Sequence, residues 1–302
     1  MASTMELSAY RVAAVQMDII PGTMERNRDH ATELAGQAIS LGARLVVFPE
    51  LADIDMVEDA YALASPAPGP FTAPFERLAE RHGVHIVIGM ARRTGDALYN
   101  SAVFIGPGGI VGIYDKVHVW AGNWDVTANR WAEDPRRIEP HNYLPGRAFK
   151  VFAVDGINVG ALICYDGMFP ESWQCNRLLG ADMVVWPTNR GNYGDVDVPA
   201  LARYFQLNVM AVNRFGRSSY WCQGDSQVVD AQGRVLAHAY NGEAVLVADL
   251  DLESSRRWRR SLPYLRDRRP DIYEQILART PLEEMAPGIP SNQVTPLWRS
   301  RR

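Results

Sequence analysis

The chain has 302 residues, of which 47% are hydrophobic and 22% are charged, and its formal net charge is −4. This composition is that of a globular protein, and the slightly acidic balance excludes a global attraction to nucleic acid or to an acidic membrane surface. No apolar run approaches the roughly 20 residues that a membrane-spanning helix needs, and the N-terminus lacks the basic region and apolar core of a signal peptide.

The first half of the chain alternates between apolar runs of strand length and segments with helical spacing. In chain order, the pattern predicts a strand over 11–17, a helix over 24–41, a strand over 45–48, a helix over 75–82, and strands over 84–90, 102–105 and 110–114. The last two strands form a hairpin, because Pro107-Gly108-Gly109 between them is a tight-turn sequence.

The second half repeats this order of elements. Residues 180–188 match 42–50 nearly residue for residue. The other matching segments are 157–163 with 11–17, 207–212 with 84–90, and 227–239 with the first hairpin. A repeat this long indicates one architecture built twice. Each half would be a sheet with helices on one face, and the bare sheet faces would pack together, which predicts an α/β fold, a four-layer αββα sandwich.

A cysteine follows the first strand of the second half. The apolar run 159–163 ends at Cys164, a polar turn follows, and a helix begins at Pro170. Reactive groups of α/β enzymes lie at such strand ends, and amides at the start of a helix would favour the thiolate. Alternatively, Cys164 is a buried small hydrophobic residue, as most free cysteines are.

Two further ionisable residues lie at strand ends. Glu50 follows the strand 45–48, and Lys116 follows the hairpin arm 110–114. Because the repeat brings the matching strand ends to one edge of the sandwich, we expect Glu50 and Cys164 to be neighbours. Together the three side chains have the chemistry of acyl transfer: a thiol nucleophile, a carboxylate base and an ammonium group for the oxyanion, aided by the backbone N–H of Tyr165.

These motifs resemble those of the nitrilase superfamily of carbon–nitrogen hydrolases, which have a Glu–Lys–Cys triad. The matching segments are VFPE (47–50), YDKVH (114–118), YLPG (143–146), ICYDGMFPE (163–171) and LRDRRPDIY (265–273). The resemblance implies a hydrolase domain over 8–275. It also implies a homodimer or larger homo-oligomer, and a C-terminal tail over 276–302 that contacts another subunit or is partly disordered.

The resemblance also implies a second glutamate shortly before the Pro-Gly turn, near the lysine and the substrate. The spacing to Pro145-Gly146 favours Glu139, and Glu133 is the other candidate. The alternative for Glu139 is an exposed loop carboxylate without a catalytic role.

The residues after the cysteine bear on the substrate. Tyr165-Asp166 resembles the amidase-like branches of the family rather than the nitrilases, which typically carry Trp-Glu there. Gly167 and Met168 replace the arginines with which the N-carbamoyl-D-amino acid hydrolases grip a carboxylate, so a free carboxylate on the substrate is less favoured unless Arg190 binds it.

Several residues near the predicted strand ends are candidates for substrate binding. They are Tyr165, Trp120, Trp186, Asn189 and Arg190, with Trp124 and Tyr193 as further aromatic candidates. For any one of the aromatic residues, ordinary packing is the alternative.

Cysteine and histidine usage bears on cofactors and compartment. Three cysteines without CxxC spacing argue against a disulfide framework or a zinc site, and the histidines show no ligand spacing. We therefore expect a cytoplasmic enzyme without metal or cofactor, and without nucleic-acid or membrane partners. It would hydrolyse an amide or N-carbamoyl bond of a small molecule through a Cys164 thioester. The alternatives are acyl transfer to an amine, nitrile hydrolysis, and a non-catalytic binding or scaffold protein.

Overall fold

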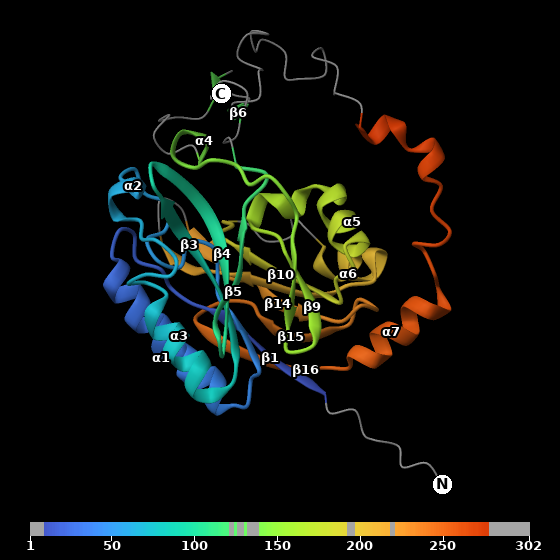
Figure 1. Cartoon of the computed structure of the whole chain (residues 1–302), viewed down its shortest axis with the longest axis horizontal. Helices are drawn as coiled ribbons and strands as arrows, with labels where there is room; N and C mark the ends of the chain where they lie inside the picture. The colour runs from blue at the N-terminus through green and yellow to red at the C-terminus, as the bar shows by residue number, and fades with distance from the viewer. Residues whose placement is uncertain are drawn as a thin grey trace.

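Two six-stranded sheets form the centre of the computed structural model, which describes residues 9–120, 124–125, 130–131, 139–191, 197–217 and 221–277 (Figure 1). The first sheet has the order β16-β1-β2-β3-β4-β5. Its strands are β1 (Tyr10–Gln16), β2 (Leu45–Val47), β3 (His85–Thr94), β4 (Ala97–Gly106), β5 (Gly109–Asp115) and β16 (Ala244–Leu250).

The second sheet has the order β15-β14-β11-β10-β9-β8. Its strands are β8 (Val151–Val154), β9 (Ile157–Ala161), β10 (Met183–Thr188), β11 (Asn208–Asn213), β14 (Ser226–Val229) and β15 (Val235–Ala239). In each sheet three neighbouring strands run parallel, β1-β2-β3 in the first and β9-β10-β11 in the second. This correspondence confirms the predicted duplication.

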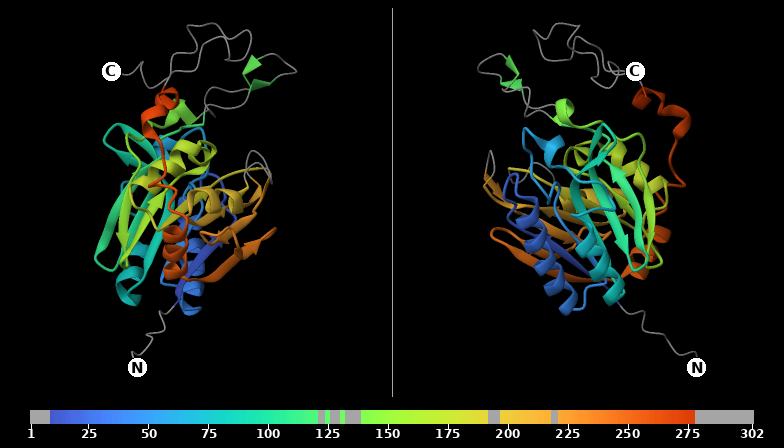
Figure 2. Two further views of the ribbon diagram at one scale, coloured as in Figure 1. Left: turned by 90° about the vertical axis from the view of Figure 1, so that its right-hand side faces the viewer. Right: turned by 60° about the vertical axis from the view of Figure 1, so that its left-hand side comes forward.

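Helices cover the outer faces of the two sheets (Figures 1 and 2). The helices α1 (Met24–Ser40) and α3 (Ala73–His82) lie side by side on the first sheet, and α5 (Pro170–Leu178) and α6 (Val198–Phe205) lie on the second. The shorter elements are α2 (Ala60–Leu63), α4 (Glu139–Asn142), and the small strand pairs β6 (Trp124–Asp125) with β7 (Arg130–Trp131) and β12 (Phe215–Arg217) with β13 (Trp221–Gln223).

Three apolar layers hold the sandwich together, as period-two alternation along the strands requires. Val12 and Ala14 of β1 face the second sheet, whereas Ala13 and Val15 face the helices. The layer between the two sheets contains side chains from both halves of the repeat. The αββα sandwich predicted from the sequence is therefore confirmed.

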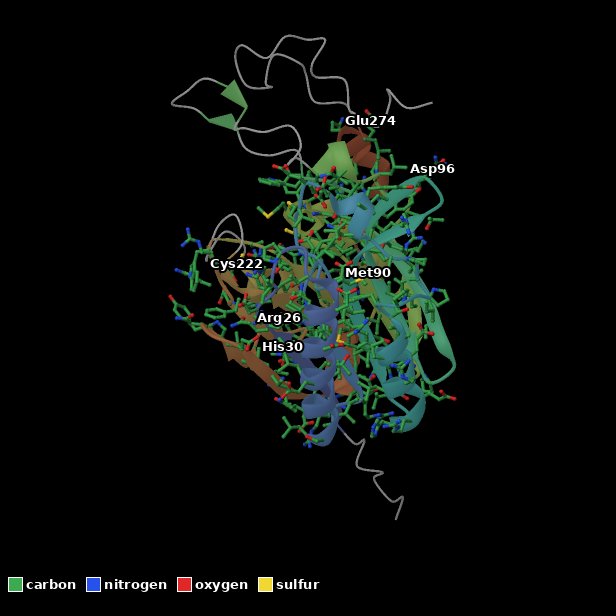
Figure 3. The ribbon with its side chains drawn as sticks, turned by 90° about the vertical axis from the view of Figure 1, so that its left-hand side faces the viewer. Arg26, His30, Met90, Asp96, Cys222 and Glu274 are labelled. Carbon is green, nitrogen blue, oxygen red and sulfur yellow. The ribbon has the colours of Figure 1, made fainter. Side chains whose placement is uncertain are left out.

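Some details differ from the sequence-based expectation. The strand β16 lies late in the second half, yet it pairs antiparallel with β1 and so completes the first sheet. The strand β8 and the helix α6 have no counterpart among the elements expected from the sequence. The first helix, predicted over 24–41, ends at Ser40, and Leu41 is 51% exposed. His30 of α1 contacts Glu243, beside β16, through an Nε2–Oε1 distance of 2.7 Å (Figure 3).

Seven arginines lie between residues 256 and 269, and the first four of them belong to the helix α7 (Leu252–Ser261). Arg259 of α7 binds Asp182 with an Nη1–Oδ1 distance of 3.1 Å and donates through Nε to the carbonyl of Gln206. Arg259 therefore binds α7 to the rest of its own chain. The described chain contains no helix long and apolar enough to cross a membrane.

Candidate active site

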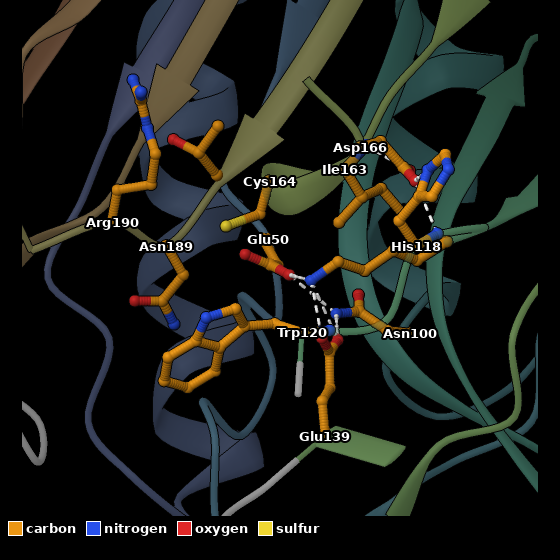
Figure 4. A network of polar contacts seen from close by, with 12 residues as sticks. Glu50, Asn100, His118, Trp120, Glu139, Ile163, Cys164, Asp166, Asn189 and Arg190 are labelled. Atoms are coloured by element: carbon orange, nitrogen blue, oxygen red, sulfur yellow. Dashed lines mark hydrogen bonds and ion pairs between the residues drawn. The ribbon is translucent and has the colours of Figure 1, made fainter. Parts of the chain in front are cut away.

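Four chain segments bring the predicted catalytic residues together (Figure 4). Glu50 lies in the loop after β2, Lys116 directly follows β5, Glu139 is the first residue of α4, and Cys164 begins the 3₁₀ turn Cys164–Met168 that follows β9. The alternative that Glu139 is an exposed loop carboxylate is wrong, because its side chain is completely buried. Glu133, the alternative second glutamate, lies outside the described residues.

The lysine is bound between the two glutamates. Lys116 Nζ donates to Glu50 Oε1 at 2.8 Å, and to Glu139 Oε1 and Oε2 at 3.0 and 2.8 Å. Asn100 Nδ2 of β4 donates to both carboxylates as well, at 2.7 Å to Glu50 and 2.6 Å to Glu139. All four side chains are buried. Sequence reasoning missed Asn100, although an amide in an otherwise apolar strand is a signal that a buried polar partner lies nearby.

Burial and charge act in opposite directions on these groups. Burial raises the pKa of Glu50, the Lys116 charge opposes this rise, and the Glu139 carboxylate adds to it. Burial alone would lower the pKa of Lys116, but the carboxylates of Glu139 and Glu50 outweigh it and raise that pKa well above its ordinary value. The lysine is therefore a fixed positive charge, and Glu50 is a carboxylate that accepts a proton more readily than an exposed one.

The second oxygen of Glu50 has a different environment. Glu50 Oε2 is buried and has no hydrogen-bond partner among the described residues. In Figure 4 it points toward the sulfur of Cys164. Burial, followed by the Glu50 charge, raises the pKa of the Cys164 thiol, while Lys116 and the backbone N–H of Asn189 act in the lowering direction. The resting thiol is thus protonated, and a carboxylate oxygen is available to take its proton.

Cys164 has a strained backbone. Its φ of +44° lies in the left-handed region, which costs a non-glycine residue about 1–3 kcal/mol. Asp166 holds the turn: its carboxylate accepts hydrogen bonds from Tyr114 Oη, from the backbone N–H and ring Nδ1 of His118, and from the backbone N–H of Ile163. The distances are 2.7 to 3.0 Å. Asp166 therefore joins the nucleophile turn to the segment that carries Lys116.

A glycine in the YLPG segment permits a close approach at the lysine. A Cβ at Gly146 would lie 2.0 Å from the carbonyl oxygen of Asp115, and the Gly146 N–H donates to the Lys116 carbonyl at 2.7 Å. This segment therefore packs directly on the backbone that positions the lysine.

Three chain segments carry the substrate-binding candidates Trp120, Tyr165, Asn189 and Arg190. Trp120 is half-buried, and its backbone N–H donates to Glu139 Oε2 at 2.5 Å. Its indole lies on the side of the site toward which the Cys164 sulfur points (Figure 4). Tyr165 is half-buried and packs edge-on against Phe169. Asn189 and Arg190 directly follow β10, and the Arg190 guanidinium lies 4.6 Å from the ring centre of Trp186.

The expected substrate contact of Trp186 finds no support in this geometry. Its side chain is completely buried, and its indole N–H donates to the Cys164 carbonyl at 2.9 Å. A Cβ at Gly167 would lie 2.2 Å from the Trp186 ring, so no arginine side chain fits at position 167 without displacing the tryptophan. Trp186 therefore stabilises the turn that carries Cys164, through its packing against Gly167 and its hydrogen bond to the Cys164 carbonyl. The side chain of Trp124, and Tyr193, lie outside the described residues.

Among the described residues, no group of three or more His, Cys, Asp and Glu side chains is placed to hold a metal ion.

Known proteins resemble this chain in both sequence and structure. The family model of the carbon–nitrogen hydrolases matches residues 11–260. A nitrilase of Pyrococcus abyssi is 32% identical over 274 residues, which cover 87% of this chain and 98% of the relative. An (R)-stereoselective amidase of Pseudomonas sp. is 33% identical over 233 residues, covering 74% of this chain and 79% of the relative. A carbon–nitrogen hydrolase structure from Helicobacter pylori G27 superposes with a TM-score of 0.76 at 26% identity, covering 90% of this chain and 99% of the other. The chain therefore belongs to the carbon–nitrogen hydrolase family of the nitrilase superfamily and is a hydrolase of carbon–nitrogen bonds other than peptide bonds.

Proposed function

We propose that this enzyme hydrolyses a linear amide or N-carbamoyl bond of a small molecule through a thioester on Cys164. The products would be an acid, or carbon dioxide from a carbamoyl group, together with ammonia or an amine. The observation that carries this proposal is that the two carboxylate oxygens of Glu50 have different environments. Oε1 accepts hydrogen bonds from Lys116 and Asn100, whereas Oε2, which has no hydrogen-bond partner among the described residues, points toward the Cys164 sulfur.

The first half-reaction forms the acyl-enzyme. Glu50 Oε2 takes the thiol proton, and the sulfur attacks the amide carbon to give a tetrahedral oxyanion. Lys116 Nζ and the backbone N–H of Tyr165 stabilise that negative charge. As the carbon–nitrogen bond breaks, Glu50 returns the proton to the leaving nitrogen. Because burial raises the pKa of Glu50, its protonated form persists long enough to act as this acid.

The second half-reaction releases the product. Water replaces the amine, Glu50 takes one of its protons, and the resulting hydroxide attacks the thioester. Collapse of this tetrahedral intermediate breaks the carbon–sulfur bond, and Glu50 returns its proton to the sulfur, which restores the thiol. Glu139 transfers no proton in this scheme. Its carboxylate accepts hydrogen bonds from Lys116 and from the backbone N–H of Trp120 and so holds both in place.

Nitrile hydrolysis is the second candidate, because a relative that is 32% identical to this chain, about as similar as the amidase relative, is named a nitrilase. The Tyr165-Asp166 sequence after the nucleophile favours the amide. Acyl transfer to an amine would share the acyl-enzyme and differ only in what attacks it.

The experiment measures ammonia release from a panel of simple amides, N-carbamoyl compounds and nitriles, with Cys164→Ala as the control. Release from amides or N-carbamoyl compounds that disappears in the variant supports the proposal and identifies the substrate type, whereas release from nitriles alone would support the second candidate. Retained turnover in Cys164→Ala would contradict it. Adding an amine acceptor and analysing the products separates hydrolysis from acyl transfer.

A further inference from the structure

A second group of buried polar side chains lies beside the proposed catalytic residues. Arg214 Nη1 and Asp55 Oδ2 are 2.6 Å apart, and the two side chains are 0% and 1% exposed. Arg214 Nη2 also donates to the carbonyl of Ile19 at 2.6 Å and lies 3.5 Å from Asp18 Oδ1. Asn189 completes the group, because its Nδ2 donates to Asp55 Oδ1 at 2.7 Å. We call Asp55, Asn189 and Arg214 the rim clamp.

The rim clamp joins loops from both halves of the duplicated fold. Asp55 lies in the loop after β2, Asn189 directly follows β10, and Arg214 directly follows β11. The loop of Asp55 is also the loop of Glu50, and Asp55 has a φ of +60°, a conformation that needs support in a non-glycine residue. The clamp therefore binds the loop of the proposed base to the segments that follow β10 and β11, the two central strands of the second sheet.

The other end of the clamp lies at the nucleophile. Asn189 follows β10 and the Cys164 turn follows β9, which is the parallel neighbour of β10, so Asn189 lies beside the Cys164 sulfur (Figure 4). A hydrogen bond from the Asn189 backbone N–H acts to lower the pKa of the thiol. The side chain of Asn189 is nearly fully buried, and its Oδ1 lies 3.5 Å from the Sγ of Cys222 as well (Cys222 is marked in Figure 3). Fixing this side chain fixes the direction of the backbone N–H, since both belong to one residue.

A purely stabilising role accounts poorly for this arrangement. Removing two charges from water costs several kcal/mol per ion, so a buried ion pair is weak support for stability. Such a pair is better explained where it selects one arrangement of the groups around it. Here the selected arrangement is that of two loops that carry or contact proposed catalytic residues.

We propose that Asp55 and Arg214 are positioning residues that, through Asn189, hold a backbone N–H on the Cys164 sulfur and so promote thiolate formation. This inference rests on the proposed role of Cys164 as nucleophile. The charged groups that act on the thiol are Glu50, Lys116 and Arg190. Those around the clamp itself are Asp18 and Asp53.

The test measures the rate at which iodoacetamide alkylates Cys164 as a function of pH, read by mass spectrometry of the Cys164 peptide. The variants are Asp55→Asn, Asn189→Ala and Arg214→Lys. Asp182→Asn is the matched control, because Asp182 and Arg259 form another largely buried Asp–Arg pair, at α7. Thermal melting establishes that each variant is folded.

We expect Asp55→Asn and Asn189→Ala to alkylate about 10-fold more slowly at pH 7, with the midpoint of the pH profile raised by about one unit, the effect of losing one hydrogen bond to the thiolate. Arg214→Lys should lie between them and the wild type, because lysine keeps a positive charge beside Asp55 but lacks the second guanidinium nitrogen, which donates to the Ile19 carbonyl. Asp182→Asn should keep the wild-type profile.

A folded Asn189→Ala with the wild-type profile, or an equal loss in Asp182→Asn, would overturn the inference. Asn189→Ala leaves the ion pair intact, so it decides the question even if Asp55→Asn does not fold. Alkylation needs no substrate: the expected shifts in an enzyme that hydrolyses no amide would uphold the clamp and contradict the proposed function. An unchanged profile with intact amide hydrolysis would overturn the clamp alone.

Discussion

Glu50, Glu139 and Lys116 form a buried cluster with one more carboxylate than ammonium group. When both carboxylates are ionised, the cluster carries a net negative charge next to the thiol. Burial raises the pKa of the Cys164 thiol, and the Glu50 charge raises it further, while the Lys116 charge opposes the rise. The site is therefore poised with a neutral thiol, and attack on a substrate must be coupled to proton transfer to Glu50.

Replacing Lys116 should abolish activity and lower the stability of the fold. We expect Lys116→Met to abolish amide hydrolysis and to lower the free energy of unfolding by about 3–5 kcal/mol, because two buried carboxylates lose their counter-ion. Chemical denaturation measures the second effect. Lys150→Met is the matched control, since Lys150 is exposed and should change neither quantity. A Lys116→Met protein as active as the wild type would contradict this role.

The pH dependence of kcat/KM reports on the base. Glu50 acts in its carboxylate form, and its pKa is raised above the ordinary value of 4.5 in the folded protein. Activity should therefore be lost as the pH falls through a midpoint higher than 4.5. Glu50→Gln should lower kcat/KM by about 10²–10⁴-fold. An acidic limb at or below the pKa of a free glutamate would show that another group limits the rate.

At the scale of the elements, the turn Cys164–Met168 sets the direction of the nucleophile. Its left-handed cysteine is maintained by contacts on both sides: Trp186 binds the Cys164 carbonyl, and the Asp166 carboxylate binds donors from the preceding strand end and from the lysine segment. The strain is thus offset by interactions within the turn and by two partners that are distant in the sequence, Trp186 and the segment of Lys116.

Asp166 can be tested by a nearly isosteric change. Asp166→Asn keeps the volume but replaces one acceptor oxygen by a donor, which faces donors in this site. We expect a loss of about 1–3 kcal/mol in the free energy of unfolding, the cost of leaving a buried polar group unsatisfied. Asp249→Asn should cost less than about 1 kcal/mol, because the Asp249 pair with Arg11 is exposed. Equal stability of the two variants would contradict the account of the turn.

Elements whose pattern is local can be predicted from the sequence. The apolar runs of β2 and β10 are visible because each is buried on both faces. Glu50 and Cys164 can be identified as the residues that follow the strands β2 and β9. Asn100, in contrast, bridges carboxylates from two distant segments, and the pairing of β16 with β1 joins strands near opposite ends of the chain. Sequence reasoning assigns Trp186 to the pocket because aromatic residues near strand ends fit either role, and only its packing against Gly167 distinguishes them.

At the scale of the whole molecule, the duplicated sandwich places proposed catalytic residues from both halves at a shared edge. Glu50 and Lys116 come from the first half and Cys164 from the second, so neither half contains a complete site. The predicted domain limit at 275, the cytoplasmic location and the oligomeric state stay predictions.

The predicted subunit role of the tail can be tested by truncation. If residues 276–302 contact another subunit, a chain that ends at residue 275 should stay folded and shift to a smaller assembly, because it lacks that contact. Size-exclusion chromatography with light scattering measures the mass of the assembly, and thermal melting establishes that the shortened chain is folded. An unchanged assembly would contradict the predicted role of the tail.

The central claim is the thioester on Cys164, and partitioning of the acyl group between water and hydroxylamine tests it most directly. Two amides of the same acid with different leaving amines would be hydrolysed in the presence of hydroxylamine, and the ratio of hydroxamate to acid measured for each. One common acyl-enzyme predicts the same ratio for both substrates, and no product from Cys164→Ala. A ratio that changes with the leaving amine, or turnover that persists in Cys164→Ala, would contradict the account.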